Sequence, residues 1–527
     1  MVRILLVAAV VLGVGVDAFF AIVNFYPVAP HRDRGPKRYV VMQLDEVQAA
    51  WFQANILDDF NAEFAANLEV QRVTDEEQLQ TATAKHEDVV LTALPVTQLG
   101  HAMETRLVRP FTDAISATRI ARDFEGLGDS VLAAGKVGGT QYFLPRMAVI
   151  DVAVYRVSKV RDAVLHWSVL RPQIDAALKQ INGRGLPAGF ELGLTPSTWS
   201  SYDLFVMGYY WAHRSYGGQP ARPRIAHRTG DEIDGQRDIV AAIYRMGATD
   251  ATAAKFDSRA VLDFFQWETL SRTANIYEPE MYADDPFDDE AVIDGLQKGE
   301  LFFAPIDAME AFNLHGGSHA AAAPHVDDPA DLEFTSMPHG ASLELDGKGH
   351  PARTRPSFSF REDWVWALPA AAKSPELAYK LVQFMWRPEI HARECEAIGM
   401  LPLHPEVVSE RVSRFRLEWM SHVFEAGLVQ AQHGQPTPPG MVVQGFGSVY
   451  AQLWKTIVVG KLSTESEIAA ALHAPPKPKP LEVATVPDAD HVAAKPKEPE
   501  ETSPPTTEDE DWERDVVLEG VGSGAHP

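Results

Sequence analysis

The stretch SFREDWVWALPAAAKSPELAYKLVQFMWRPEIHARECEAIGMLPLHP, residues 359–405, places one short strand before two clearly delimited helices. The strand EDWVWAL puts Trp364 and Trp366 on one face, because strand residues two apart point the same way. Ser374, followed by proline and glutamate, marks a helix start. A second helix ends before Gly399, which suits a helix C-terminus. This order of elements predicts a mixed α/β protein.

The preceding chain repeats the same alternation of strand and helix. Apolar runs at 38–46, 68–73 and 87–94 are separated by amphipathic helical patterns, which implies parallel pairing of the strands. The extended run around 141–155 is longer than one lobe's strand needs, and a buried strand is expected at 301–306. A chain of 527 residues should hold more than one core, so two lobes with appendages are predicted.

Charge and motifs exclude several classes of function. The net charge of −26 would repel a phosphate backbone, so no nucleic-acid partner is expected. Cys395 is the single cysteine and can form neither an internal disulfide nor a cysteine metal cluster. The chain lacks the phosphate-loop, zinc-protease and nucleophile-elbow motifs, and the acidic run 282–290 lacks calcium-loop spacing. We therefore predict no catalytic residues, no metal and no cofactor.

The two ends of the chain differ from its body. Residues 1–30 carry an apolar run of about 20 residues, which predicts either a signal peptide or a membrane anchor. Residues 475–527 are rich in proline, glutamate, lysine and threonine and predict a disordered tail. An exported protein in the periplasm or another extracytoplasmic space, anchored or free, is expected.

Together with the opening stretch, seven motifs resemble those of the extracellular solute-binding proteins of ABC importers, family 1, which includes maltose-binding protein and other sugar binders. The motifs are DDFNAEFAANLEVQRV, HEDVVLTAL, LVRPFTD, GGTQYFLPRMAVIDVAVYRV, TPSTWSSYD, LQKGELFFAPIDAM and VVGKLSTESEIAAAL. They occur in the family's order, and the likeness spans 39–474. Two departures stand out: Arg146 and Met147 replace small and acidic residues, and Asp307-Ala308-Met309 replaces Gly-x-Trp.

The resemblance implies a two-lobed periplasmic-binding-protein fold, type II-like, with a ligand cleft between the lobes. Lobe 1 would comprise 38–148 and 302–358, and lobe 2 would comprise 149–301 and 359–474. The chain would cross between the lobes near 147–152 and 301–308, with a third crossing near 355–362. The protein would capture a small solute, a sugar or oligosaccharide by default, close by hinge motion, and deliver the solute to permease subunits in the membrane.

The resemblance also places ligand-binding residues at the carboxyl ends of strands, where open α/β sheets bind ligands. These residues are Asp45, Glu46, Thr92, Arg146, Asp307, Met309, Trp364 and Trp366. Carboxylates and an arginine would bind hydroxyls, and an indole would cover a sugar ring. For Asp45 and Glu46 the alternative is helix capping, and for the two tryptophans it is a place in the core. An arginine in an apolar run, such as Arg146, must find an anionic or hydroxyl partner.

Two other functions remain open from the sequence. One is a carbohydrate-active hydrolase that uses acids such as Asp45, Glu46 and Asp307. The other is a sensing or scaffolding protein that keeps the binding fold without a transported ligand.

Overall fold

The computed structural model describes the body of the chain. The described residues are 35–44, 46–74, 76–85, 88–125, 132, 135–137, 139–216, 219–220, 223–230, 232–283, 285–314, 328–409, 418–436 and 445–477. The segment predicted at 1–30 and nearly all of the predicted tail lie outside them. Within this part of the chain, no helix is both long and apolar enough to cross a membrane.

The first lobe is built on a mixed seven-stranded sheet with the order β17-β16-β3-β1-β2, in which β4 and β7 also pair with β16. As predicted, β1 is parallel to β2 and β3, whereas β16 runs antiparallel to β3 and β7. The strands are β1 (Arg38–Gln43), β2 (Leu68–Val73), β3 (Val89–Pro95), β4 (Val108–Arg109), β7 (Phe143–Ile150), β16 (Phe360–Pro369) and β17 (Gln435–Pro436).

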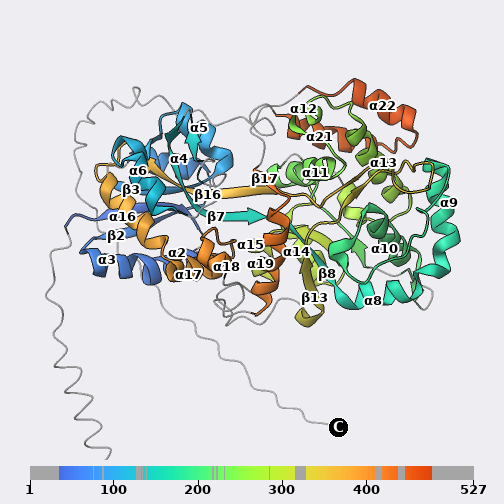
Figure 1. Cartoon of the computed structure of the whole chain (residues 1–527), viewed down its shortest axis with the longest axis horizontal. Coiled ribbons are helices and arrows are strands. Elements are labelled where there is room, and N and C mark those ends of the chain that lie inside the picture. The colour runs from blue at the N-terminus through green and yellow to red at the C-terminus, as the bar shows by residue number, and fades with distance from the viewer. Residues whose placement is uncertain are drawn as a thin grey trace, which may run out of the picture. The chain divides into compact units, whose positions relative to one another are not determined.

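Helices cover this sheet, and their boundaries follow local signals (Figure 1). Ser374 is the N-cap of α16, proline occupies the first position, and Gly399 ends α17 in the left-handed conformation with φ 85°. A π-helical turn at Gln53–Leu57 joins α2 to α3. The helices are α2 (Glu46–Phe52), α3 (Asp58–Phe64), α4 (Glu76–Lys85), α5 (Leu99–Glu104), α6 (Ala117–Asp123), α16 (Pro375–Met385), α17 (Pro388–Ile398) and α18 (Pro405–Ser409).

The second lobe is built on a four-stranded sheet with the order β11-β12-β8-β13. Strands β11 (Arg224–Ile225) and β12 (Leu301–Ile306) are parallel, whereas β8 (Val152–Arg156) is antiparallel to β12 and to β13 (Leu332–Thr335). Its helices are α8 (Val157–His166), α9 (Arg171–Asn182), α10 (Ser201–His213), α11 (Ile233–Arg245), α12 (Asp250–Ala253), α13 (Arg259–Thr273), α14 (Asp289–Gln297), α15 (Ala308–Leu314), α19 (Glu418–Ala431), α21 (Phe446–Trp454) and α22 (Glu465–His473).

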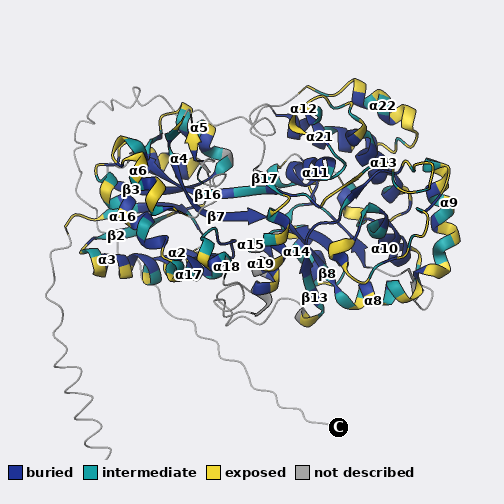
Figure 2. Cartoon of the chain, in the orientation of Figure 1, coloured by how far each residue is buried: buried dark blue, intermediate teal, exposed yellow. Residues whose placement is uncertain are grey.

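Strands β7 and β16 contribute to the cores of both lobes (Figures 1 and 2). On β7, Leu144 and Met147 belong to the first lobe's core and Ile150 to the second. On β16, Trp366 packs in the first core and Phe360 in the second. One antiparallel pair of strands therefore extends from one core into the other.

The cores revise the predicted division of the chain. Residues 302–358, predicted in lobe 1, supply most of β12 and all of β13 and α15, and the buried apolar residues of these elements belong to the second lobe's core. Residues 359–474, predicted wholly in lobe 2, are divided: β16 to α18 and the short strand β17 join lobe 1, and α19, α21 and α22 join lobe 2. The chain passes between cores near Asp151 and Ser359 and again between α18 and α19, not near 301–308. The lobe to which a segment belongs depends on which distant strands pair with it, and local sequence patterns carry no information about that pairing.

The close approach of α10 to β11 requires a glycine at 208. A Cβ at Gly208 would lie 2.2 Å from Ile276 Cγ2 and 2.8 Å from Ile225 Cδ1. We predict that Gly208→Ala lowers the free energy of unfolding by about 1 kcal/mol, because overpacking costs more than the gain in helix propensity. Gly100→Ala, in α5 where a Cβ meets no atom within 4 Å, is the matched control. Urea unfolding should show destabilisation only for Gly208→Ala; equal effects would contradict the prediction.

Candidate functional site

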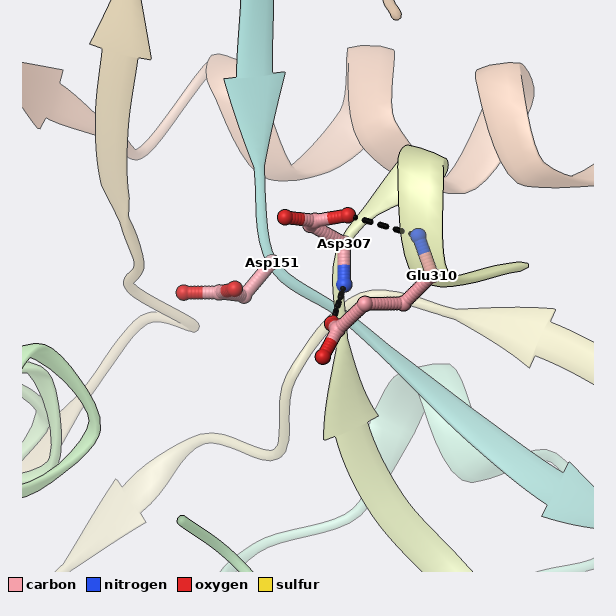
Figure 3. A group of neighbouring side chains, drawn as sticks. All are labelled: Asp151, Asp307 and Glu310. Atoms are coloured by element: carbon pink, nitrogen blue, oxygen red, sulfur yellow. Dashed lines mark hydrogen bonds between the residues drawn. The ribbon is translucent and has the colours of Figure 1, made fainter. Parts of the chain in front are cut away.

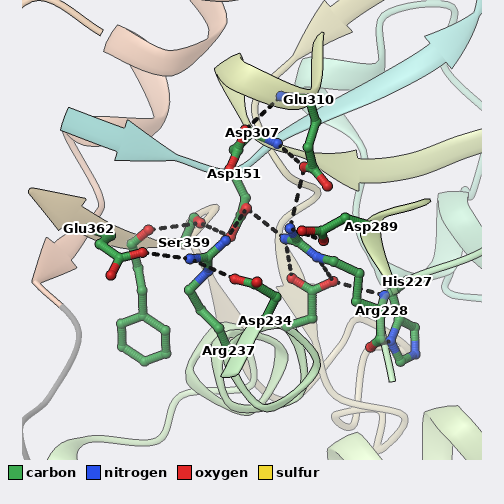
Figure 4. A network of polar contacts seen from close by, with 12 residues as sticks. Asp151, His227, Arg228, Asp234, Arg237, Asp289, Asp307, Glu310, Ser359 and Glu362 are labelled. Atoms are coloured by element: carbon green, nitrogen blue, oxygen red, sulfur yellow. Dashed lines mark hydrogen bonds and ion pairs between the residues drawn. The ribbon is translucent and has the colours of Figure 1, made fainter. Parts of the chain in front are cut away.

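A polar cluster lies where the connecting strands enter the second lobe (Figure 4). Arg228 follows β11, Asp307 follows β12, and Asp151 joins β7 to β8. Because β11 and β12 are parallel, their carboxyl ends meet at one edge of the sheet, where ligands of open α/β sheets bind. The cluster therefore occupies the position that the topology favours for a site.

Arg228 is the centre of this cluster. Its side chain is 1% exposed and contacts four carboxylates. Its Nη2 lies 2.7 Å from Asp151 and 2.8 Å from Asp238, and its Nη1 lies 3.1 Å from Asp289 and 3.3 Å from Glu310. These acids come from the β7–β8 junction and from helices α11, α14 and α15, so one guanidinium holds four segments together.

Arg237, on α11, joins the two lobes. Its Nη2 lies 3.3 Å from Asp151, and its Nη1 lies 3.0 Å from Asp234 and 3.1 Å from Glu362. Glu362 is on β16, so this ion pair connects a helix of the second lobe to a strand of the first lobe's sheet (Figure 4).

Asp307 and Glu310 form a reciprocal cap at the start of α15 (Figure 3). The Asp307 N–H donates to Glu310 Oε2 at 2.6 Å, and the Glu310 N–H donates to Asp307 Oδ1 at 2.9 Å. Asp151 brings a third carboxylate, with one oxygen from each residue within 4.8 Å of the others. Such oxygens suit a hard cation, but Arg228 and Arg237 already neutralise Asp151. The trio therefore fits a metal poorly.

Seven carboxylates surround the two guanidiniums of this cluster: Asp151, Asp234, Asp238, Asp289, Asp307, Glu310 and Glu362. Burial raises the pKa of Asp307 to about 6, although Arg237 opposes the shift. Burial also raises the pKa of Glu310, and the neighbouring Asp307 and Asp289 add to it. Burial would raise the pKa of Asp151 too, but Arg237 and Arg228 outweigh it and hold the value at about 2. The cluster thus combines ionised and protonatable acids.

Of the residues predicted for the site, Asp307 lies in the cluster and Met309 packs from α15 against the first lobe's core. Asp45 lies outside the described residues. Glu46 is exposed in the first turn of α2, as its capping alternative predicts. Thr92 is fully buried on β3, 3.5 Å from the Thr83 hydroxyl, and it pairs with Ala367 of β16, five residues beyond Glu362 of the cluster.

Arg146, Trp364 and Trp366 are brought together, but inside the first lobe. The Arg146 guanidinium lies 2.9 Å from Glu394, and both side chains are 1% exposed. It also lies 4.8 Å from the ring centre of Trp366 and 6.0 Å from that of Trp364. The required anionic partner of Arg146 is thus supplied by the protein, and Trp366 occupies the core. Trp364, half-buried, packs at the edge of the same core.

Asp151, Arg228, Arg237, Glu310 and Glu362 are site residues that were not predicted from the sequence. Asp151 carries a readable signal, because it interrupts the apolar run VIDVAV and a buried acid needs a partner. The others carry none. Arg228 and Arg237 lie in the insertion PRIAHRTGDEIDGQRD, which has no counterpart in the resemblance.

Comparison with known proteins identifies the fold. No family model and no curated protein matches the sequence. Among solved structures, the cyclic α-maltosyl-1,6-maltose binding protein from Arthrobacter globiformis is similar, with a TM-score of 0.58 and 13% identity over 84% of this chain and 98% of that one. The chain has the two-lobed fold of the sugar-binding ABC solute-binding proteins.

Two further structures with this solute-binding fold show the same extent of similarity. The GacH receptor of Streptomyces glaucescens, solved unliganded and with acarbose, has a TM-score of 0.57 and 13% identity over 83% of this chain and 96% of that one. The maltotriose binding protein of Thermus thermophilus, bound with maltotriose, has a TM-score of 0.54 and 13% identity over 83% and 98%. The solute-binding fold therefore accounts for most of the chain.

The Arg146–Glu394 pair gives a stability test. Glu394→Leu leaves a buried guanidinium without its counter-ion, and we expect it to lower the free energy of unfolding by about 3–5 kcal/mol. The double variant Arg146→Met/Glu394→Leu removes both charges and should lie within about 1 kcal/mol of the wild type. Urea unfolding followed by tryptophan fluorescence measures both. A double variant as unstable as the single one would show that the pair itself stabilises the lobe.

The raised pKa of Asp307 predicts a pH dependence of stability. Because its folded pKa is about 6, above the usual value near 3.9, the folded state keeps a proton that the unfolded chain loses between these values. Stability should fall as pH rises from about 4 to 6. Asp307→Asn, which can keep the cap through its amide oxygen, should show a smaller fall than the exposed control Asp285→Asn in urea unfolding at each pH. If the free energies of unfolding of the two variants depended on pH in the same way, the raised pKa of Asp307 would be contradicted.

Proposed function

We propose that the protein is the substrate-binding component of an ABC importer, which captures a small solute between its lobes and delivers it to membrane permease subunits. The observation that carries this proposal is the polar cluster at the carboxyl ends of β11 and β12, joined to β16 through Arg237 and Glu362. The solute-binding fold supports it. A ligand at this position would contact both lobes, as capture between lobes requires.

We propose a sugar or oligosaccharide as the ligand class. Several carboxylates keep accessible oxygens, because the side chains of Asp289, Asp234 and Glu362 are 45%, 33% and 19% exposed. Carboxylate oxygens accept hydrogen bonds from adjacent hydroxyls, and the half-buried indole of Trp364 offers an apolar face for a sugar ring. The similar structures named above are described as binding maltose-type sugars or acarbose, which agrees with this chemistry.

Ligand binding would shift the population of the protein from an open state to a closed state of the two lobes. The passages near Asp151 and Ser359 lie beside the cluster, where Ser359 Oγ is 3.3 Å from Asp151 Oδ2. A ligand that contacts Asp289 on one lobe and Glu362 on β16 would therefore act directly at the connection between the cores.

The proposed location is the periplasm or another extracytoplasmic space, with residues 1–30 acting as an export signal or membrane anchor.

A binding role is also favoured over hydrolysis. Asp307, one of the acids considered for catalysis, is bonded to Glu310 in the α15 cap, and Asp151 is held by two arginines. These contacts give Asp307 and Asp151 structural roles, which disfavours them as the paired acids of glycoside hydrolysis.

Thermal unfolding of the full-length protein against a library of sugars, polyols, amino acids and anions tests the proposal. A sugar at about 100 times its dissociation constant should add roughly 2.7 kcal/mol and raise the melting temperature by a few degrees. The shift should be lost in Asp289→Asn/Glu362→Gln, which removes two accessible carboxylates of the cluster. Glu290→Gln, an exposed neighbour in the first turn of α14, is the matched control and should keep the shift.

Hydrogen–deuterium exchange with the same sugar locates the response. Protection should increase around residues 147–152 and 355–362, at the passages between the cores. A flat response across the library, or a thermal shift that Asp289→Asn/Glu362→Gln leaves unchanged, would count against a sugar site in the cluster.

A further inference from the structure

Two adjoining cavities lie inside the second lobe, between its sheet and helices α10, α11 and α13. One has a volume of about 60 Å³ and the other about 90 Å³. They share seven lining residues, among them Arg245, Glu268 and Tyr277. A water needs on the order of 10–15 Å³ by this measure, so the combined space admits a small organic molecule.

Arg245, at the end of α11, lines both cavities with few partners. Among the described residues it makes one hydrogen bond, from Nη1 to the Phe358 carbonyl oxygen at 3.0 Å, and no ion pair. A guanidinium carries five N–H groups, so most of its donors are left for the cavity. Arg245 is surrounded by protein atoms, but its side chain keeps some accessible surface because it faces the cavities. Burial lowers the pKa of Arg245, although Asp238, Asp151 and Glu268 oppose the shift.

The acids nearest to Arg245 already have cationic partners. Asp238 and Asp151 are bound by Arg228, at 2.8 and 2.7 Å. Glu268 accepts hydrogen bonds from the Tyr277 hydroxyl at 2.8 Å and the Trp454 indole at 3.0 Å, and it pairs with His227 at 3.1 Å.

Of the charged groups lining the cavities, Arg245 is therefore the one without a direct counter-ion among the described residues. A buried charge without its partner is costly, and an anion in the cavity would relieve that cost.

The remaining walls are mostly apolar. The 90 Å³ cavity is bordered by side chains of Leu204, Phe205, Phe264, Trp267 and Met337. A ligand here would thus have one anionic end and an apolar body, since small-molecule sites are mostly apolar with a few placed polar groups.

We propose that these cavities bind a small aliphatic or aromatic monocarboxylate, whose carboxylate accepts hydrogen bonds from Arg245 and whose apolar part lies against α10 and α13. The smaller cavity reaches Asp151, Asp238 and Ser359 at the edge of the cluster, whereas the larger cavity is lined by residues of the second lobe alone. Binding of the monocarboxylate does not depend on the proposed transport of a sugar.

The test uses the full-length protein with butyrate and with butyramide, its neutral counterpart of nearly equal size. Butyrate should raise the melting temperature by a few degrees at saturation, and isothermal titration calorimetry should show one site per chain. Butyramide should give at most a small shift, because a planar fork of N–H donors binds a carboxylate far better than a neutral amide. Equal responses to both compounds, or none to either up to tens of millimolar, would overturn the proposal and leave a water-filled cavity.

Variants separate recognition from folding. Arg245→Met should lose the butyrate response, whereas Arg161→Met, an exposed arginine on α8, should keep it. Ala242→Leu keeps Arg245 but fills space that both cavities share, so it should also lose the response. If either Arg245→Met or Ala242→Leu folds and still binds butyrate with unchanged affinity, the site is elsewhere and the proposal is wrong.

Discussion

The antiparallel pairing of β7 with β16 is the contact on which the arrangement of this protein depends. Seven residue pairs join the strands, from Arg361 opposite Ile150 to Ala367 opposite Phe143. The pairing enters both cores, so neither lobe is complete without it. At its end in the second lobe, the chain turns at Asp151 on one strand and at Ser359 on the other. The site is thus built at the point where the connection between lobes begins.

Electrostatics at that point follows from the same geometry. The junction places Asp151 beside Arg228 and Arg237. Arg228 also contacts acids of α11, α14 and α15, and Arg237 contacts acids of α11 and β16. Guanidiniums are well suited to this role, because they stay charged when buried and offer donors in several directions. Burial, together with neighbouring carboxylates, raises the pKa values of Asp307 and Glu310, while Asp289 and Asp234 stay partly exposed at the rim.

Local features of this fold could be predicted from the sequence, and long-range ones could not. The caps at Ser374 and Gly399 are set by neighbouring residues, so pattern alone located them. The division of the chain between lobes depends on which strand pairs with which, and it was predicted incorrectly for 302–358. The site shows the same limit. Asp307 could be proposed because it follows a strand, whereas Arg228 gains its importance only from carboxylates up to 82 residues away.

Three arginines, two of them fully buried and one lining a cavity, differ in how the structure supplies a partner for the charge. Arg146 lies in an apolar strand and receives Glu394 from 248 residues away, which places it in a core and removes it from ligand binding. Arg228 receives four carboxylates and becomes the centre of the junction. Arg245 receives one carbonyl oxygen and borders open volume. Each of these guanidiniums requires a partner for its charge. Arg146 and Arg228 find carboxylates within the chain and have structural roles, whereas the partner that we propose for Arg245 is a bound carboxylate.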